Sequence, residues 1–177
     1  MNILEIFTNS ILLIITLDNE LWDIILLSLF VSFTALIIAS LLGFIVGYYF
    51  AIYNFYFKKI ILIIINSLMG IPPVVVGLIV YFIFASGGPL GILQLLYTPS
   101  AMIIAQTIII FPIIASLSHE IFSKNWFEFK DQIRSLNIPF WGSVKLLFNH
   151  SYFLLITTLL SAFGRAISEV GAVMIVG

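Results

Sequence analysis

The chain has 177 residues, of which 62% are hydrophobic and 8% are charged, and its formal net charge is −1. Its mean hydropathy of +1.23 excludes a soluble domain of this size and identifies an integral membrane protein. Backbone groups in lipid have to be hydrogen-bonded within the protein, so the predicted fold class is all-α, a polytopic helical bundle. The absence of cysteine excludes disulfides and thiolate metal sites.

The first 23 residues form a segment distinct from the spans. Its apolar run, Ile11 to Leu17, is too short to cross a bilayer. Apolar residues nevertheless recur on one helical face, which predicts a helix lying at the membrane surface. A frayed N-terminus is the alternative. Residues 1–23 contain no basic residue and no small-residue cleavage site, so they do not resemble a signal peptide.

Four spans are predicted at about 24–47, 60–85, 101–118 and 151–177, with a polar segment at 119–150. The first span contains a GxxxG pair, Gly43 and Gly47, which allows another helix to approach closely. Tyrosines, phenylalanines and two lysines follow this span and are typical of a membrane exit.

The second predicted span is interrupted at its middle. The residues that interrupt it are Asn66, Ser67, Gly70, Pro72, Pro73 and Gly77. Each proline lacks an N–H, and the carbonyls that lose a partner are tolerated in lipid only beside protein or a water-filled cavity. This predicts a break that faces a transport pathway. A structural kink without a pathway role is the alternative.

The third and fourth spans carry isolated polar groups. Gln106, in the third, is expected to hydrogen-bond a neighbouring helix. Arg165 and Glu169 lie near the middle of the fourth, one turn apart, where a neutralised pair is far less costly than a lone charge. They are predicted either at the gate of a pathway or as an ion pair that fixes helix register. Small residues beside them predict a tight helix–helix contact: Ser161, Gly164, Ser168, Gly171 and Ala172.

The segment 119–150 reads as two short amphipathic helices, the first from about Trp126 to Leu136. Asn137 is expected to take a left-handed conformation that ends this helix, and Pro139 suits the first turn of the next. Positive charge sets the topology. Residues 48–59 and 119–150 hold six basic residues, whereas 1–23 and 86–100 hold none. The N-terminus is therefore predicted outside and segment 119–150 in the cytoplasm.

Three stretches resemble the permease subunits of binding-protein-dependent ABC importers, and most closely the tungstate importers within the molybdate, tungstate and sulfate group. They are Asn66–Tyr81 (NSLMGIPPVVVGLIVY), Gly88–Gln106 (GPLGILQLLYTPSAMIIAQ) and Phe163–Gly177 (FGRAISEVGAVMIVG). The resemblance implies a type I importer transmembrane domain over residues 24–177. It also implies cytoplasmic ATP-binding subunits, an extracytoplasmic oxyanion-binding protein, a second permease copy and a prokaryotic inner membrane. The family core has one further span after this segment, so a chain lacking its last span is expected.

The segment 119–150 is similar to the family's EAA loop, which docks on the ATPase. Asp131 falls at the Glu of that pattern, Gln132 and Ile133 at the two Ala, and Asn137 at the Gly. Arg134, Ser135 and Leu136 match residues often found before that Gly. The resemblance therefore implies that 131–137 is the ATPase-coupling loop.

The predicted function is a permease that imports an oxyanion, most closely tungstate, by alternating access. Molybdate or another oxyanion, a truncated scaffold that does not transport, and a stand-alone channel are alternatives. A membrane enzyme has little support, because Arg165 and Glu169 are the only ionisable residues within the predicted spans. No phosphate-binding G-x-x-x-x-G-K-[ST] motif occurs, so ATP hydrolysis is expected in a partner. Neither a cofactor nor a nucleic-acid partner is expected.

Overall fold

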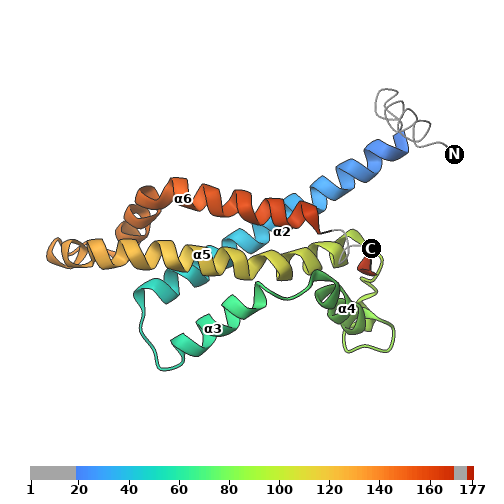
Figure 1. Cartoon of the computed structure of the whole chain (residues 1–177), viewed down its shortest axis with the longest axis horizontal. Helices are drawn as coiled ribbons and strands as arrows, with labels where there is room; N and C mark the ends of the chain where they lie inside the picture. Colours follow the sequence, from blue (N-terminus) through green and yellow to red (C-terminus); the bar gives the residue numbers. More distant parts are fainter. Residues whose placement is uncertain (1–18, 170–174) are drawn as a thin grey trace.

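The computed structural model describes residues 19–169 and 175–177. The segment predicted to lie on the membrane surface falls almost wholly outside them. The described chain is a bundle of long helices with no strand (Figure 1). Its elements are α2 (Asn19–Ile52), α3 (Lys58–Leu68), α4 (Pro73–Phe84), the short 3₁₀ helix η1 (Gly91–Leu93), α5 (Pro99–Ser135) and α6 (Phe140–Ser168). This confirms the all-α fold class.

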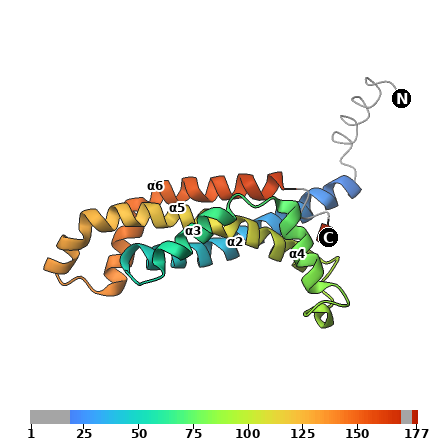
Figure 2. The ribbon, with the colours of Figure 1, turned by 60° about the horizontal axis from the view of Figure 1, so that its bottom comes forward.

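Three described helices are long and apolar enough to cross a membrane: Leu21–Ile52 within α2, then α5 and α6. The second predicted span is present as α3 and α4, which are bent by 103° at the break between them. The protein is therefore a multi-pass membrane protein. The chain runs away from its N-terminus along α2, back along α3, away along α5 and back along α6 (Figures 1 and 2).

The helices extend beyond the predicted spans at one end of the bundle. α5 continues from the third span to Ser135, and α6 begins at Phe140, so only four residues of 119–150 lie outside a helix. The separate amphipathic helix predicted from Trp126 is thus wrong, because that stretch is the last part of α5. No glycine or proline occurs between Pro112 and Asn137, so nothing in the sequence ends the helix where it leaves the apolar region.

At the other end, α6 ends before the end of the span predicted there. It ends at Ser168, and Glu169 already has a non-helical backbone with φ −93° and ψ 82°. Val176 accepts a hydrogen bond from the N–H of Tyr97 (2.8 Å), so the last described residues lie beside the start of α5. The prediction of one helix over 151–177 is therefore wrong.

Small residues make the closest contact in the bundle, between α2 and α5. The predicted GxxxG pair carries this contact: a Cβ atom added to Gly43 would lie 2.8 Å from Cγ2 of Ile114, and one added to Gly47 would overlap the Ser118 hydroxyl. Ser118 Oγ donates to the carbonyl of Gly43 at 3.3 Å. Fully buried alanines continue the contact along both helices: Ala35, Ala39, Ala101 and Ala105. Backbones that approach this closely gain dispersion contacts that lipid cannot supply.

We expect Gly47→Ala to destabilise the protein by about 1–3 kcal/mol, because the added methyl group would push α2 away from Ser118 and the backbone of His119. Gly87→Ala is the control. A Cβ at Gly87 meets no atom within 4 Å and the backbone there is not left-handed, so this substitution should leave stability nearly unchanged. Unfolding of the purified protein in detergent measures both. Equal effects of the two substitutions would contradict the predicted contact.

Candidate coupling hairpin and transport pathway

The turn between α5 and α6 is closed by backbone hydrogen bonds. The N–H of Ile138 donates to the carbonyl of Ile133 (3.0 Å), and that of Asn137 to the carbonyl of Arg134 (3.1 Å). These two bonds form a Schellman motif, which requires a left-handed residue at Asn137. Its φ is +49°, as predicted. Asn137, which falls at the Gly of the EAA pattern, therefore takes the left-handed conformation that this turn requires.

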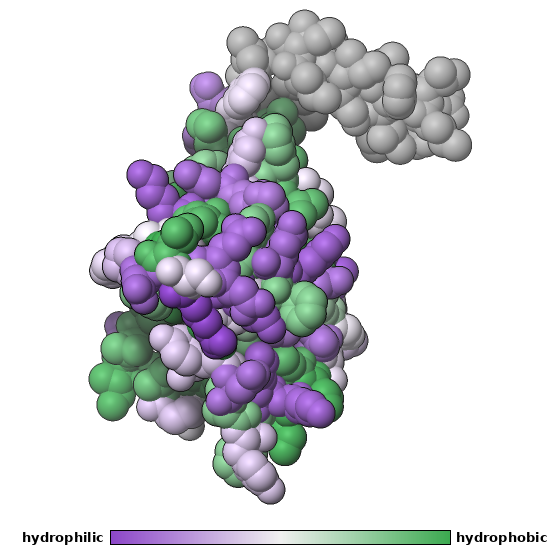
Figure 3. Space-filling view, turned by 90° about the vertical axis from the view of Figure 1, so that its left-hand side faces the viewer, coloured by the Kyte–Doolittle hydropathy of each residue, from purple (hydrophilic) through white to green (hydrophobic). Residues whose placement is uncertain are grey.

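The predicted coupling residues form the exposed tip of this hairpin. Asp131, Gln132, Arg134, Ser135 and Asn137 are exposed, and Ile133 alone is buried. Leu136, 73% exposed, adds an apolar side chain at the turn. Figure 3 views this end of the molecule and shows hydrophilic side chains over most of it, with isolated hydrophobic ones between them. The hairpin thus offers a mixed polar and apolar surface, supported from within by Ile133.

An aromatic cluster lies beneath the hairpin, where α2, α5 and α6 meet. The ring of Tyr48 packs edge-on against Phe122 (centroids 5.7 Å apart) and against Phe140 (5.9 Å). Phe148 contacts Phe122 (4.9 Å) and Phe44 (5.9 Å). Among the aromatic residues that follow the first predicted span, Tyr48 is buried, whereas Tyr49, Tyr53, Tyr56 and Phe57 are exposed.

A buried polar contact joins the two arms of the hairpin. Nδ2 of Asn125 on α5 donates to Oγ of Ser151 on α6 at 2.5 Å, and both side chains are buried. Neither this pair nor the aromatic cluster was among the features predicted from the sequence. In the sequence, an asparagine, a serine and several aromatic residues lie on the inward faces of continuous helices. These residues could have been recognised as a contact only if α5 and α6 had been known to continue through this region.

The break between α3 and α4 places its polar residues on the surface. α3 ends at Leu68, and Pro72 has an extended backbone before α4. Two carbonyls left by the break are satisfied by short turns: the N–H of Gly70 donates to Ser67, and that of Ile71 to Leu68. The structure therefore pairs part of the backbone groups that a proline break would leave unpaired in lipid, including the carbonyl of Leu68, four residues before Pro72.

The side chains at the break differ in what they offer a ligand. Asn66 Oδ1 accepts from Ser116 Oγ of α5 (2.6 Å), which leaves its exposed Nδ2 group without a partner among the described residues. Ser67 Oγ donates to the carbonyl of Ile63 (2.8 Å). Gly70 and Pro72 are exposed and Pro73 is half-buried. The surface of the break therefore offers a ligand the free Nδ2 group of Asn66 and the exposed residues Gly70 and Pro72.

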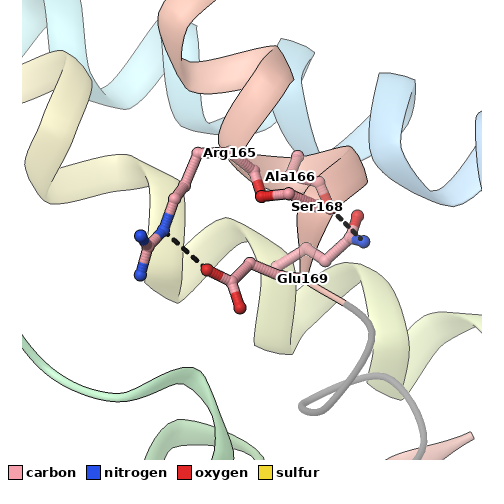
Figure 4. Close-up of polar contacts among 5 residues, drawn as sticks. Arg165, Ala166, Ser168 and Glu169 are labelled. Atoms are coloured by element: carbon pink, nitrogen blue, oxygen red, sulfur yellow. Dashed lines mark hydrogen bonds and ion pairs between the residues drawn. The ribbon is translucent and has the colours of Figure 1, made fainter.

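Arg165 and Glu169 form the predicted ion pair, but at the end of α6 and not near its middle. Nε of Arg165 lies 2.7 Å from Oε1 of Glu169, and the side chains are 39% and 14% exposed (Figure 4). Just beside them, Nε2 of Gln106 donates to the carbonyl of Ala166 (3.2 Å), which confirms the expected contact between α5 and α6. Among the described residues, no hydrogen bond or ion pair links Arg165 or Glu169 to Asn66–Pro73.

The predicted site residues therefore fall into separate groups. The coupling residues occupy one end of the bundle, whereas the break and the ion pair lie toward the other end (Figures 1 and 2). Of the small residues predicted to pack tightly on α6, Ser161, Gly164 and Ser168 are exposed, and a Cβ added to Gly164 would meet no atom within 4 Å among the described residues. Gly171 and Ala172 lie outside the described residues.

Known proteins similar to this chain are transport proteins. The chain is 38% identical over 175 residues to the tungstate uptake system permease protein TupB of Peptoclostridium acidaminophilum, a match that covers 99% of this chain and 77% of that protein. The chain belongs to this ABC transporter permease family. No protein-family model matches it.

Two further relatives extend the comparison. A probable anion ABC transporter permease protein of Haloferax volcanii is 37% identical over 150 residues, which are 85% of this chain and 65% of that protein. TupB of Campylobacter jejuni is 36% identical over 126 residues, or 71% of this chain and 52% of that protein. The matches to the first two relatives include most of the residues that form the hairpin and the bundle.

The hairpin turn gives a testable prediction about this permease. Asn137→Val should destabilise it by about 1–3 kcal/mol, because a β-branched residue is strained at φ +49°. Asn137→Gly should leave stability unchanged or raise it slightly, because glycine adopts this conformation without strain. Detergent unfolding of both variants checks the prediction. A neutral valine variant would show that the turn does not require a left-handed residue.

Proposed function

We propose that this permease is the membrane subunit of an importer for an oxyanion, with tungstate as the preferred substrate. The observation that carries the proposal is the 38% identity to a tungstate uptake permease along nearly the whole chain. A second relative named for tungstate uptake and one named for anion transport point to the same substrate class. Molybdate, which has the same charge and shape class, is the competing substrate.

The proposed docking site for a separate ATPase is the hairpin tip, Asp131 to Asn137. Support comes from its exposure, from the Schellman turn that fixes its shape, and from its continuity with α5 and α6. A movement of the tip would be carried into the bundle by two unbroken helices and not by a flexible loop. The aromatic cluster around Tyr48 would pass part of the same movement to α2.

Alternating access is proposed to occur between two copies of this chain. The exposed small residues Ser161, Gly164 and Ser168 leave room for a second copy to approach α6. The exposed break at Asn66–Pro73 would then line the pathway, where the Nδ2 group of Asn66 is a suitable donor for an anion. We assign Arg165 and Glu169 to scaffolding beside the gate, because a carboxylate is a poor ligand for an oxyanion. An external binding protein would deliver the anion at the end away from the hairpin.

Copurification with the ATPase and the binding protein, followed by a hydrolysis assay with and without tungstate, tests the proposal. We expect the three proteins to copurify and tungstate to stimulate hydrolysis more strongly than sulfate does. If the complex forms but hydrolysis does not respond to any oxyanion, the substrate assignment fails. If the ATPase does not bind, the docking assignment fails.

A matched pair of variants locates the docking surface. Leu136→Glu should abolish ATPase copurification, because it places a charge in the exposed apolar position of the hairpin tip. Ile92→Glu changes an even more exposed apolar residue in η1, at the opposite end, and should leave copurification intact. Detection of both variants in the membrane fraction at equal levels controls for folding. Loss of binding in both, or in neither, would contradict docking at the hairpin.

The absence of cysteine makes the proposed orientation directly testable. Ser135→Cys at the hairpin and Ser86→Cys after α4 each introduce one exposed thiol. In intact cells, a membrane-impermeant maleimide should label the second variant and not the first, because six basic residues favour a cytoplasmic hairpin. Labelling of the first variant alone would reverse the proposed orientation, with the N-terminus inside.

A further inference from the structure

The direction of α4 differs from that of the long helices. It is bent by 103° from α3, and both views show it running across the long axis of α5 (Figures 1 and 2). Because α5 is one of the helices long enough to cross a membrane, its axis lies near the membrane normal. We propose that α4 lies in the plane of the membrane, in the leaflet away from the hairpin, with its exposed side against lipid acyl chains.

The chain does not need α4 to cross the membrane. The 11 residues of α3 rise about 16 Å, and the four residues from Met69 to Pro72 add at most about 13 Å. Together they reach up to about 29 Å from Lys58, close to the thickness of the hydrocarbon core, which is about 30 Å. The 12 residues of α4 would add about 18 Å more. If α4 continued along the membrane normal, much of it would project into water.

The buried side of α4 faces the first turns of α5. Val76, Val80 and Phe84 recur at four-residue steps and are buried. They belong to the same cluster as Ala101, and both views show α4 beside the N-terminal end of α5. The apolar part of α5 runs from Ala101 to Ser118, about 26 Å, which is nearly the thickness of the hydrocarbon core. α4 therefore lies close to the hydrocarbon boundary that is farther from the hairpin.

The exposed side of α4 is apolar along its whole length. Val74, Leu78 and Phe82 form a stripe opposite the buried side, with exposed fractions of 54%, 46% and 63%. Val75 and Ile79 flank this stripe and are also exposed. The sequence from 60 to 118 contains no charged residue, so neither α4 nor its neighbours offer an ionic contact to water or to another protein.

The size of these side chains favours lipid over a second copy of the chain. Helices that pack together within a membrane favour small residues, as the contact of Gly43 and Gly47 with α5 illustrates. The exposed stripe of α4 consists instead of valine, leucine and phenylalanine, which acyl chains surround without loss. α4 thus acts as an anchor that holds the start of α5 at a fixed depth. This inference does not depend on the substrate or on the ATPase.

Spin labels on single cysteines test the proposal in the full chain, which contains no cysteine of its own. Val74→Cys, Leu78→Cys and Phe82→Cys place labels at equal steps along the stripe in phosphatidylcholine vesicles. We expect collision rates with oxygen and with a water-soluble nickel chelate to give nearly the same depth for all three. A helix along the membrane normal would change the depth by about 12 Å over these eight residues. Val75→Cys and Ile79→Cys repeat the measurement where a label on the stripe prevents reconstitution.

The spanning helix α2 supplies the matched control. Ile37→Cys, Leu41→Cys and Ile45→Cys have the same spacing on an exposed apolar stripe, and their labels should become steadily shallower toward Ile45. A similar steady change along α4 would overturn the proposal, as would a label at Phe82 that meets the chelate as freely as a label in water. Protection of all three α4 labels from oxygen, with dipolar broadening between labels, would also overturn it, because a second copy would then cover α4.

Discussion

The contact between α2 and α5 is the constraint on which the rest of the bundle depends. Lipid tails are as apolar as leucine side chains, so helices in a membrane gain little from burying apolar surface against each other. They gain from close approach, which here requires Gly43 and Gly47 opposite Ile114 and Ser118. With α2 held against α5, the rings of Tyr48 and Phe44 are placed where they meet Phe122 and Phe148. The aromatic cluster follows from the glycine contact.

That cluster explains how a short turn can be joined firmly to a membrane bundle. The tip at Asp131–Asn137 is exposed, but a few turns below it the arms are fixed by the Asn125–Ser151 hydrogen bond and by the contact between the rings of Phe122 and Phe148. Buried polar contacts of this kind are costly to break because both partners would be left unsatisfied. The hairpin is thus an extension of the bundle, and α2, α5 and α6 share one packed core at its base.

The parts of this arrangement that could be predicted from the sequence are those in which a single residue determines the local structure. The left-handed turn at Asn137, the proline break near Pro72 and the glycine contact of α2 each follow from the backbone or size of a residue. The helix lengths could not be obtained from hydropathy. The apolar stretch of α5 ends near Ser118, but a helix ends only where its backbone is interrupted, and the next interruption is at Asn137. The sequence feature that indicates the length of α5 is therefore the lack of glycine and proline over that stretch.

The candidate site was harder to predict for a different reason. Small residues at Ser161, Gly164 and Ser168 indicate that another helix can pack closely against α6, but they do not identify that helix. Spacing likewise places Arg165 and Glu169 on one face without fixing where α6 ends. Because the helix stops at Ser168, the pair closes its last turn, beside the bond between Gln106 and Ala166. The hydrogen bond from Gln106 to Ala166 joins the end of α6 to α5, and the neutralised pair lies beside it within the last turn of α6.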